Sequence, residues 1–346
     1  MKSIIELKIL QIGAFHAGTG RTPTNADALK VRLEGLNIHS ICASYKLGGF
    51  RRAIDMAATL FRKRRRYSTV LIHVFSGNAY LWVLMSTLIA KKLGKRVVYW
   101  LHGGNLPSYS RRHPSLVKLG FGNADRIFAP SGYLKAAFAD EYAVEILPYE
   151  LEVKSYPYRK RTEISLRLLW LRAFNAGYNP LMAVRVVHRL AQRYPSVHLM
   201  MCGPDNGDGS FQATRRLAEK LGVSERIEMP GKVSKERIRE LGQECDIFIN
   251  TTNVDNTPVS VIEAMAMGMC VVSTNVGGIP YLISNERDAL LVLPDDDEGM
   301  AEACSLLVSD EEFASRLSEN ARMASKKFEW GALAPVWESV LRETPE

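Results

Sequence analysis

Long apolar runs and targeting segments are missing from this sequence. It has no run of roughly eighteen uncharged apolar residues, the length that a membrane-spanning helix requires. The first residues, Met1-Lys2-Ser3, lead directly into a predicted strand over 8–12, without the apolar core and cleavage site of a signal peptide. We therefore expect no transmembrane helix and a cytoplasmic location.

Cysteine is also scarce, and its distribution argues against a disulfide framework. The chain has five cysteines, an odd number, and no pair of them has the spacing of metal ligands. Most lie in apolar segments that predict strands or helices, which is typical of reduced core residues in a cytosolic protein. The five are Cys42, Cys202, Cys245, Cys270 and Cys304.

What the sequence does contain is enough apolar chain for two domains. Its 346 residues are 47% hydrophobic and 24% charged, as in an ordinary globular protein. Predicted strands alternate with helices, which is typical of parallel sheets covered on both faces. In the first half we expect strands over 8–12, 70–73, 96–101 and 126–129 and helices over 25–36, 50–65, 79–93, 115–120 and 132–139. In the second half we expect strands over 168–171, 197–202, 227–229, 247–250, 270–273 and 289–292.

The periodicity fades between residues 147 and 162, where Pro148 and Pro157 precede a charged run. Such a stretch marks a domain boundary. We therefore expect an α/β protein with two facing, Rossmann-like, doubly wound parallel-sheet domains and a cleft between them. The expected divisions are 1–155, 156–328 and a final segment over 329–346.

Residues 255–268, which read DNTPVSVIEAMAMG, are the most informative segment. Thr257 is suited to be the N-cap of a helix, and Pro258 suits the first helical position. The apolar run that starts at Val259 predicts a mostly buried helix. The N–H groups and the positive dipole end of this helix would open near Asn256, which is a natural seat for a diphosphate or a sugar.

Two carboxylates flank this helix start. Asp255 lies just outside it and Glu263 about one and a half turns inside it, so one can meet sugar hydroxyls and the other a ribose. A short buried strand over 270–274 follows, and then a glycine loop over 275–280 to which a ligand could approach closely. The alternative is an ordinary helix in which Glu263 is a satisfied polar residue.

This block closely resembles the donor-binding region of the family-four retaining glycosyltransferases, also called glycosyl transferases group 1, which have the GT-B fold. That family has two Glu residues separated by seven positions, then Ala-Met-Ala, a glycine, a strand and a glycine loop. Here Asp255, shorter by one methylene, stands at the first acidic position and Glu263 at the second. The resemblance implies a GT-B fold whose final helix, near 330–341, crosses back to the first domain.

A glycine-rich loop over 13–21 follows the first predicted strand and includes Gly13, Gly18 and Arg21. Open α/β sheets bind ligands beyond the carboxyl ends of their strands, so we expect this loop to face the cleft. Its glycine spacing is not that of a dinucleotide fingerprint. It resembles the first loop of family-four enzymes, which touches the donor phosphate and the acceptor; a tight turn is the alternative.

His102 and Gly103 follow the strand over 96–101, at another carboxyl strand end. Family-four enzymes often have a histidine before a small residue at this place, and the resemblance implies that His102 lies beneath the transferred sugar. A hydrogen-bonded structural imidazole is the alternative.

Arg172 stands where the resembling family has an arginine that neutralises the donor diphosphate. The lysine that the family has five residues later is missing, because Gly177 and Tyr178 occupy that place. Loss of a cation beside a departing diphosphate should cost several kcal/mol, unless Tyr178, Asn179 or Arg21 substitutes for it.

The resemblance also assigns the remaining contacts. It places Gly203 and Lys232 on the donor-facing side, the ribose on Glu263, and the catalytic role on His102, Asp255 and Arg172. The diphosphate would lie over Arg172 and Asn256, Thr257, Pro258 and Val259.

The co-substrate implied by the resemblance is a nucleotide-diphospho-sugar of the UDP or GDP type, with no other cofactor. Helix dipole and guanidinium can stabilise its leaving group without a metal. The acidic run Asp295–Asp297 precedes a predicted helix and is more typical of a cap than of a metal site. In the resembling enzymes the anomeric configuration is retained.

Much of the net charge of +8 lies over Lys46–Arg66, chiefly in Arg51–Arg66, and apolar residues recur beside it at helical spacing: Phe50, Ile54, Ala57, Ala58 and Phe61. Such a surface fits an anionic membrane, with the protein peripheral on its inner face. A core-packed helix that ends in a solvated basic turn is the equally weighted alternative. No recognition module accompanies the charge, so nucleic acid is not an expected partner.

The function expected from these features is a retaining, metal-independent transferase that moves a sugar to a glycan or lipid-linked acceptor in cell-surface polysaccharide biosynthesis. Two alternatives stay open. One is a non-catalytic or partner-dependent nucleotide-sugar-binding protein, which the missing lysine favours. The other is a nucleotide-sugar epimerase of the same fold, which would need further acid and base groups.

Overall fold

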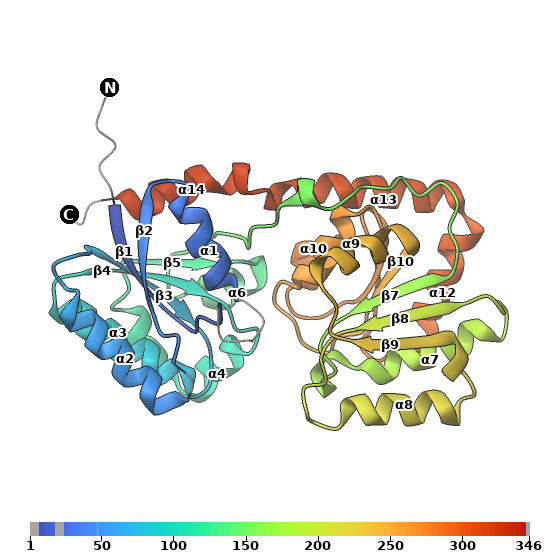
Figure 1. Ribbon diagram of the computed structural model, residues 1–346, viewed down its shortest axis with the longest axis horizontal. Helices are drawn as coiled ribbons and strands as arrows, with labels where there is room; N and C mark the ends of the chain where they lie inside the picture. The colour runs from blue at the N-terminus through green and yellow to red at the C-terminus, as the bar shows by residue number, and fades with distance from the viewer. Residues whose placement is uncertain (1–6, 18–23, 47, 344–346) are drawn as a thin grey trace. The chain divides into compact units, whose positions relative to one another are not determined.

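The computed structural model describes residues 7–17, 24–46 and 48–343, and it divides into two compact units. Unit 1 comprises residues 1–150 and 330–346, and unit 2 comprises residues 151–329 (Figure 1). None of the helices in these described ranges is long and apolar enough to cross a membrane.

Unit 1 contains a six-stranded parallel sheet with the strand order β2-β1-β3-β4-β5-β6. The inner strands β3 and β4 are buried along their whole length, which explains their mostly apolar sequences. The strands are β1 (Leu7–Ile12), β2 (Ile38–Ala43), β3 (Thr69–Val74), β4 (Arg96–Leu101), β5 (Arg126–Ala129) and β6 (Val144–Ile146). The helices are α1 (Asn25–Glu34), α2 (Gly49–Arg62), α3 (Ala79–Lys92), α4 (Leu106–Arg112), α5 (Pro114–Phe121), α6 (Gly132–Phe138) and α14 (Trp330–Arg342).

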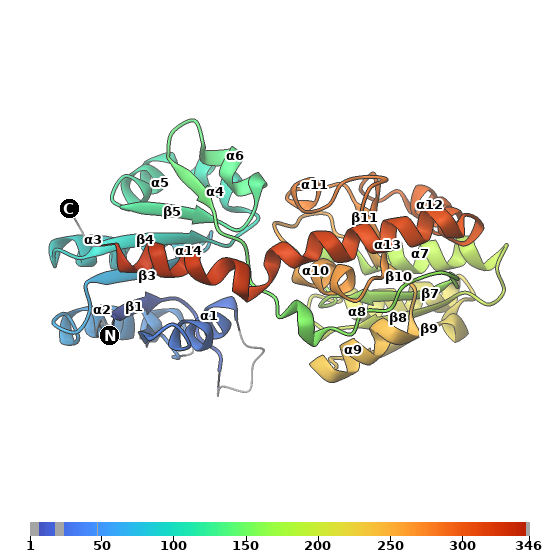
Figure 2. The same ribbon diagram turned by 90° about the horizontal axis from the view of Figure 1, so that it is seen from above.

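The final helix, α14, packs on the sheet of unit 1, on the same side as α1 (Figures 1 and 2). Its fully buried Trp337 meets Trp100 of β4 edge to face, with ring centroids 4.8 Å apart. Arg96, at the start of β4, donates a 2.6 Å hydrogen bond to the Val340 carbonyl. These contacts fix the helix to the centre of the sheet.

Unit 2 contains a second six-stranded parallel sheet, with the order β12-β11-β10-β7-β8-β9. Helices α7, α8 and α12 cover one face and α9 and α10 the other (Figure 1). The strands are β7 (Arg167–Leu171), β8 (His198–Cys202), β9 (Ile227–Gly231), β10 (Ile247–Asn250), β11 (Cys270–Thr274) and β12 (Leu290–Val292). The helices are α7 (Pro180–Ala191), α8 (Ser210–Lys220), α9 (Lys235–Glu244), α10 (Val259–Ala266), α11 (Ile279–Leu282), α12 (Asp297–Ser309) and α13 (Glu311–Ser325).

Each sheet has a point where the strand order reverses. In unit 1 this point lies between β1 and β3, and in unit 2 it lies between β7 and β10. The loops that follow these strands diverge to opposite sides of the sheet and leave a crevice, which is where open α/β sheets bind ligands. The predicted α/β class with two doubly wound parallel sheets is confirmed.

The units divide at Glu150/Leu151 and at Glu329/Trp330, whereas the sequence placed these divisions after residues 155 and 328. The segment after Glu150 packs into unit 2, because the Leu151 N–H donates a 2.8 Å hydrogen bond to the Phe328 carbonyl and Leu151 is buried in the core of that unit.

Three elements of unit 1 were not predicted. In strand β2 only the end residues Ile38 and Ala43 are buried, and the polar His39 and Ser40 interrupt its apolar sequence, so its strand pattern is weak. Strand β6 has three residues, and α4 contains Pro107 in its first turn together with three polar or charged residues near its end.

Candidate functional site

The site begins with Arg172 and Asp255, which face each other across the β7/β10 reversal of unit 2. Arg172 directly follows β7, and Asp255 lies in the loop after β10. The Arg172 guanidinium forms an ion pair with the Asp255 carboxylate, and each side chain is 13% exposed. Burial raises the pKa of Asp255, although the Arg172 charge lowers it. The structure thus brings together two of the three predicted catalytic residues.

The loop that carries Asp255 is held by hydroxyl groups. The indole N–H of Trp170 donates to the Thr251 hydroxyl at 2.9 Å, and this hydroxyl donates to the Tyr178 carbonyl at 2.8 Å. The Thr274 hydroxyl donates to the Thr252 carbonyl at 2.6 Å. Polar residues at the ends of β10 and β11 therefore fix the position of Asp255.

A glycine pair packs directly beneath this loop. A Cβ atom at Gly278 would lie 1.7 Å from the Asn256 carbonyl oxygen, and one at Gly277, whose φ is +52°, would lie 2.1 Å from the Asp255 carbonyl oxygen. The Gly278 N–H donates to the Asp255 carbonyl at 3.0 Å. We expected these glycines to allow close approach of a ligand; instead, the chain's own Asp255–Asn256 backbone lies against them.

Helix α10 starts one residue later than predicted. Pro258 is its N-cap, with an extended ψ of 110°, and Val259 is the first helical residue. The prediction that Thr257 caps the helix is wrong, because Thr257 lies one position before the cap and its hydroxyl reaches no backbone N–H of the first turn. Asn256 precedes it, with its backbone N–H 2.8 Å from Asp255 Oδ1.

Two buried hydroxyl groups stand unsatisfied at this helix start. Thr257 is 7% exposed and Ser260 is 8% exposed, yet neither hydroxyl has a hydrogen-bond partner within the described residues. The N–H groups of Val259 and Ser260, the first two helical residues, also have no acceptor within the helix, whereas the Val261 N–H donates to the Pro258 carbonyl at 3.1 Å. Buried polar groups are rarely left unpaired, so the combination indicates a place for a ligand that accepts hydrogen bonds.

Glu263, on the following turn of α10, is 2% exposed and is held by two side chains. The Tyr156 hydroxyl donates to Glu263 Oε1 at 2.7 Å, and Lys235, at the start of α9, forms an ion pair with the same oxygen. Burial, and then the charge of Glu263, raises the pKa of Tyr156. Glu263 is therefore an oriented carboxylate with Oε2 as its second acceptor.

Tyr178 occupies the neighbourhood of the missing lysine. Its ring lies beneath the Arg172 guanidinium, 4.7 Å from ring centroid to Cζ. Gly203, after β8, allows the backbone to pass close to Arg172, because a Cβ atom there would lie 1.7 Å from the Arg172 carbonyl oxygen. Lys232 is exposed just after β9. Tyr178 thus orients Arg172 but supplies no positive charge.

In unit 1, His102 belongs to a buried chain of polar side chains on one face of the sheet. His102 Nε2 lies 2.9 Å from His73 Nδ1, and His102 Nδ1 lies 2.9 Å from the Tyr149 hydroxyl. His73 Nε2 lies 3.0 Å from Gln11 Oε1, and the Gln11 amide N–H donates to Ser40 at 2.8 Å. This row of hydrogen-bonded side chains crosses four neighbouring strands, from β2 through β1 and β3 to the end of β4.

Burial keeps both imidazoles neutral. It lowers the pKa of His73 to about 3, and burial together with the neighbouring His73 lowers the pKa of His102 well below its usual value. Since the Gln11 oxygen accepts from His73 Nε2, His73 Nδ1 accepts from His102 Nε2, and His102 Nδ1 accepts from Tyr149. Both ring nitrogens of His102 are therefore engaged by protein groups.

The other predicted residues of unit 1 lie around the same strand ends. Gly13 packs against His73, because a Cβ atom added at Gly13 would lie 3.0 Å from the imidazole. A Cβ atom added at Gly103 would lie 3.4 Å from the Ser76 backbone nitrogen. Gly18 and Arg21 lie outside the described residues.

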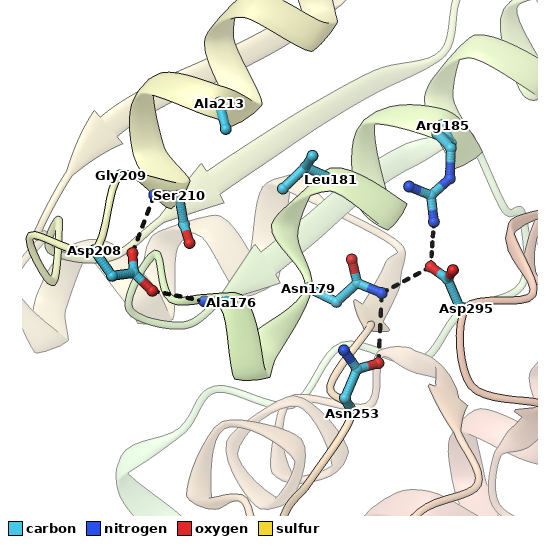
Figure 3. Close-up of a pocket in the computed structure, with 10 residues that line it drawn as sticks. All are labelled: Ala176, Asn179, Leu181, Arg185, Asp208, Gly209, Ser210, Ala213, Asn253 and Asp295. Atoms are coloured by element: carbon cyan, nitrogen blue, oxygen red, sulfur yellow. Dashed lines mark hydrogen bonds and ion pairs between the residues drawn. The ribbon is translucent and has the colours of Figure 1, made fainter.

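A hollow of about 540 Å³ lies at the starts of α7 and α8 in unit 2 (Figure 3). The starts of α7 and α8 border it: the Asp208 carboxylate accepts hydrogen bonds from the Ala176 and Ser210 N–H groups at 2.9 and 3.0 Å. Asn179 donates to Asp295 at 3.0 Å across it. The hollow shares the 175–179 and 251–256 segments with the site but contains none of the predicted site residues.

The acidic run Asp295–Asp297 serves the structure of unit 2. Asp296 accepts from the Gly299 N–H as the N-cap of α12, which confirms the predicted cap, and Asp297 pairs with Arg185 and Arg189. Within the described ranges, no group of three or more His, Cys, Asp or Glu residues is arranged to hold a metal ion.

Solved structures of known proteins share this architecture. A crystal structure of Anabaena HepE in complex with UDP and glucose matches 97% of this chain and 100% of its own, with a TM-score of 0.77 and 15% sequence identity. Sucrose-phosphate synthase from Thermosynechococcus elongatus matches 97% of this chain and 98% of its own, with a TM-score of 0.81 and 15% identity. The two Rossmann-like units therefore define a GT-B fold.

Comparison of sequences gives the family. The sequence model of the family "Glycosyl transferases group 1" matches residues 164–324. These residues therefore belong to that family, and the resemblance stated from the sequence is confirmed.

Curated relatives carry related names. D-inositol 3-phosphate glycosyltransferase of Corynebacterium jeikeium is 29% identical over 170 residues, which are 48% of this chain and 41% of that protein. The enzyme of the same name from Mycolicibacterium smegmatis is 28% identical over 160 residues, 46% of this chain and 36% of that protein. The chain thus aligns with at most about two fifths of the length of these relatives.

Several residues of the site were not predicted. Tyr156 and Lys235 come from segments far from Glu263 in the sequence, and nothing in their local pattern indicates the contact. His73 and Gln11 left a weak signal, since each is a polar residue near the end of a mostly apolar strand.

Proposed function

We propose that this protein is a retaining, metal-independent glycosyltransferase that uses a nucleotide-diphospho-sugar and transfers its sugar to a glycan or lipid-linked acceptor in cell-surface polysaccharide biosynthesis. The observation that carries the proposal is the start of α10, where the buried hydroxyls of Thr257 and Ser260 have no partner in the described chain and Arg172 lies beside Asp255.

A diphosphate suits this arrangement chemically. Its oxygens accept hydrogen bonds from the two hydroxyls and from the N–H groups of the first turn of α10, and the positive end of the helix dipole favours its charge. Arg172 can exchange part of its contact with Asp255 for a contact with phosphate, since a guanidinium has five N–H donors. These groups also stabilise the negative charge that develops as the nucleoside diphosphate departs.

The ribose belongs at Glu263 in this proposal. Tyr156 and Lys235 contact Oε1, which leaves Oε2 to accept hydrogen bonds from a ribose diol. Asp255 would face the sugar hydroxyls. Retention of configuration follows when the acceptor attacks from the same face as the leaving phosphate, which also takes the acceptor proton.

A second candidate is a nucleotide-sugar-binding protein without transferase activity of its own, or active only with a partner. It is favoured by the same segment, because Gly177 and Tyr178 stand where the family has a lysine and because Arg172 is already paired with Asp255.

Donor turnover separates these two candidates. Purified protein is incubated with UDP-glucose, UDP-N-acetylglucosamine or GDP-mannose in EDTA, and release of nucleoside diphosphate and the anomeric configuration of the released or transferred sugar are followed by NMR. The proposal predicts release above background that EDTA does not reduce, with an α-configured sugar product. Binding without turnover would support the second candidate. Substitution His102→Ala should slow turnover and leave nucleotide binding nearly intact.

A further inference from the structure

Helix α2 of unit 1 has two apolar stripes, and only one of them is buried. Met56 and Leu60 face the core, with 2% and 0% exposure. On another side of the helix, Phe50 is 80% exposed, Ile54 54% and Phe61 48%. Burial in the core of unit 1 therefore does not explain the second stripe.

The exposed residues are aligned along the helix. Phe50, Ile54 and Phe61 are separated by four and seven positions, a spacing that places side chains on one side of an α-helix. Helix α2 packs beside α3, and both lie on the face of the sheet opposite α1 and α14 (Figure 1). Helix α3 itself exposes Leu81 and Leu88, one above the other at a separation of seven.

Positive charge surrounds this stripe. Residues 49–66 contain seven Lys and Arg residues and one acidic residue, Asp55. The five consecutive cations at 62–66 are all exposed. Within the described ranges they form no ion pair, and Arg64 donates a hydrogen bond to the Phe61 carbonyl at 2.9 Å. Their charge is thus available to an external anionic surface.

We propose that this face, formed by Phe50, Ile54 and Phe61 with Arg51 and the cations at 62–66, docks on an anionic lipid bilayer. An amphipathic helix that lies in the plane of a membrane inserts bulky apolar side chains at the level of the head groups, and its cations contact lipid phosphates. The α2 face has both components: exposed apolar side chains, and cations that form no ion pair within the described ranges. A bilayer also needs no matched shape, which suits a single convex helix better than a folded protein partner does.

The inference extends the proposed function, on which its biological meaning rests: docking would bring the transferase to an acceptor held in the membrane. The binding itself is independent of turnover. Failure to bind vesicles would leave the transferase proposal untouched, and failure of donor turnover would leave the docking proposal untouched.

Vesicle sedimentation tests the inference. The full chain is spun with phosphatidylcholine vesicles and with phosphatidylcholine vesicles that contain about 30% phosphatidylglycerol, at low and at high salt. We expect binding to the anionic vesicles alone and its loss at high salt. Phe50→Ser with Ile54→Ser should weaken binding about tenfold. Arg64→Glu with Arg65→Glu should weaken it more than about twentyfold, since each nearby cation contributes about fivefold.

Matched controls keep the test specific. Val31→Ser changes an exposed apolar residue of α1 in the same unit, and Arg215→Glu with Arg216→Glu reverses two exposed charges in unit 2. Both should bind as the parent does. Absence of binding to anionic vesicles, or equal binding by the α2 variants and the parent, would overturn the inference. A protein that ignores vesicles but forms a dimer, which Phe50→Ser with Ile54→Ser dissociates, would assign the face to self-association instead.

Discussion

His73 Nδ1 and His102 Nε2 lie 2.9 Å apart inside the sheet of unit 1, and both rings are neutral because they are buried. A neutral pair can be joined by one N–H···N hydrogen bond, whereas a protonated pair would place a charge in the core. His102 therefore offers a fixed, uncharged ring at the carboxyl end of β4. Its orientation depends on Tyr149 on one side and on His73 and Gln11 on the other.

The pair predicts a pH-dependent stability. The pKa of His73 is about 3 in the folded protein, below the value of about 6.5 for an unfolded chain. Below pH 6.5 the unfolded state takes up a proton that the folded state does not, so stability is lost as the pH falls from about 6.5 towards 3. Urea unfolding at pH 6.5 and 5 should show that the parent loses roughly 1–2 kcal/mol more than His73→Asn. Equal losses would contradict the neutral pair.

Because the Thr257 and Ser260 hydroxyls have no partner in the described chain, removing them should weaken ligand binding without lowering stability. Thr257→Val with Ser260→Ala removes two buried polar groups that have no partner, so the free energy of unfolding should stay the same or rise by about 1 kcal/mol. The same change should weaken nucleoside diphosphate binding by roughly 1–3 kcal/mol, measured by calorimetry with UDP and GDP. A marked loss of stability would show that the hydroxyls are satisfied within the protein.

The glycine pair predicts a steric effect on the site. Gly278→Ala places a methyl group on the Asn256 carbonyl oxygen, so the Asp255–Asn256 backbone must move and Arg172 must lose its partner. Donor binding should fall by at least about tenfold, and the free energy of unfolding by roughly 1–3 kcal/mol. Gly331→Ala is the control, because a Cβ added there meets no atom within 4 Å beyond its chain neighbours and its own helix backbone; it should leave donor binding unchanged and should not lower the free energy of unfolding.

The position of Glu263 predicts that two substitutions weaken nucleotide binding by different amounts. Glu263→Ala removes the acceptor proposed for the ribose diol and should weaken nucleotide binding by roughly 2–4 kcal/mol. Tyr156→Phe leaves the carboxylate in place and removes one of its fixed contacts, so it should weaken binding by about 1 kcal/mol. Unchanged nucleotide affinity in Glu263→Ala would show that the donor is bound elsewhere.

Much of this fold was predictable from local patterns, because the inner strands of a parallel sheet are continuous apolar runs. Residues 96–101, 126–129 and 247–250 were placed as the structure has them for this reason. The edge strand β2 was missed because its half-exposed residues are not uniformly apolar. Arg172 was identified as the residue that directly follows β7, and Asp255 as the acidic residue just before the predicted helix start, and both match positions of the family pattern.

The contacts between distant segments were not predictable in the same way. Tyr156 and Glu263 are 107 positions apart, and the direction of the Tyr156 side chain depends on how residues 151–158 pack into unit 2. The N-cap of α10 was predicted one residue too early, at Thr257 instead of Pro258, because a proline can occupy either the cap or the first helical turn. Local sequence signals identify helix starts and strand ends, but long-range packing decides which side chains meet there.

The most direct test of the transferase proposal is a thermal-unfolding panel of UDP, GDP, ADP and their common sugar conjugates in EDTA, with the parent and with Thr257→Val Ser260→Ala. A ligand that binds the folded state alone raises the unfolding temperature by mass action. A donor diphosphate at the start of α10 predicts a chelator-insensitive rise with the nucleotides of one base, and a smaller rise in the double variant. No rise with any nucleotide, or an equal rise in both proteins, would contradict a donor diphosphate at the start of α10.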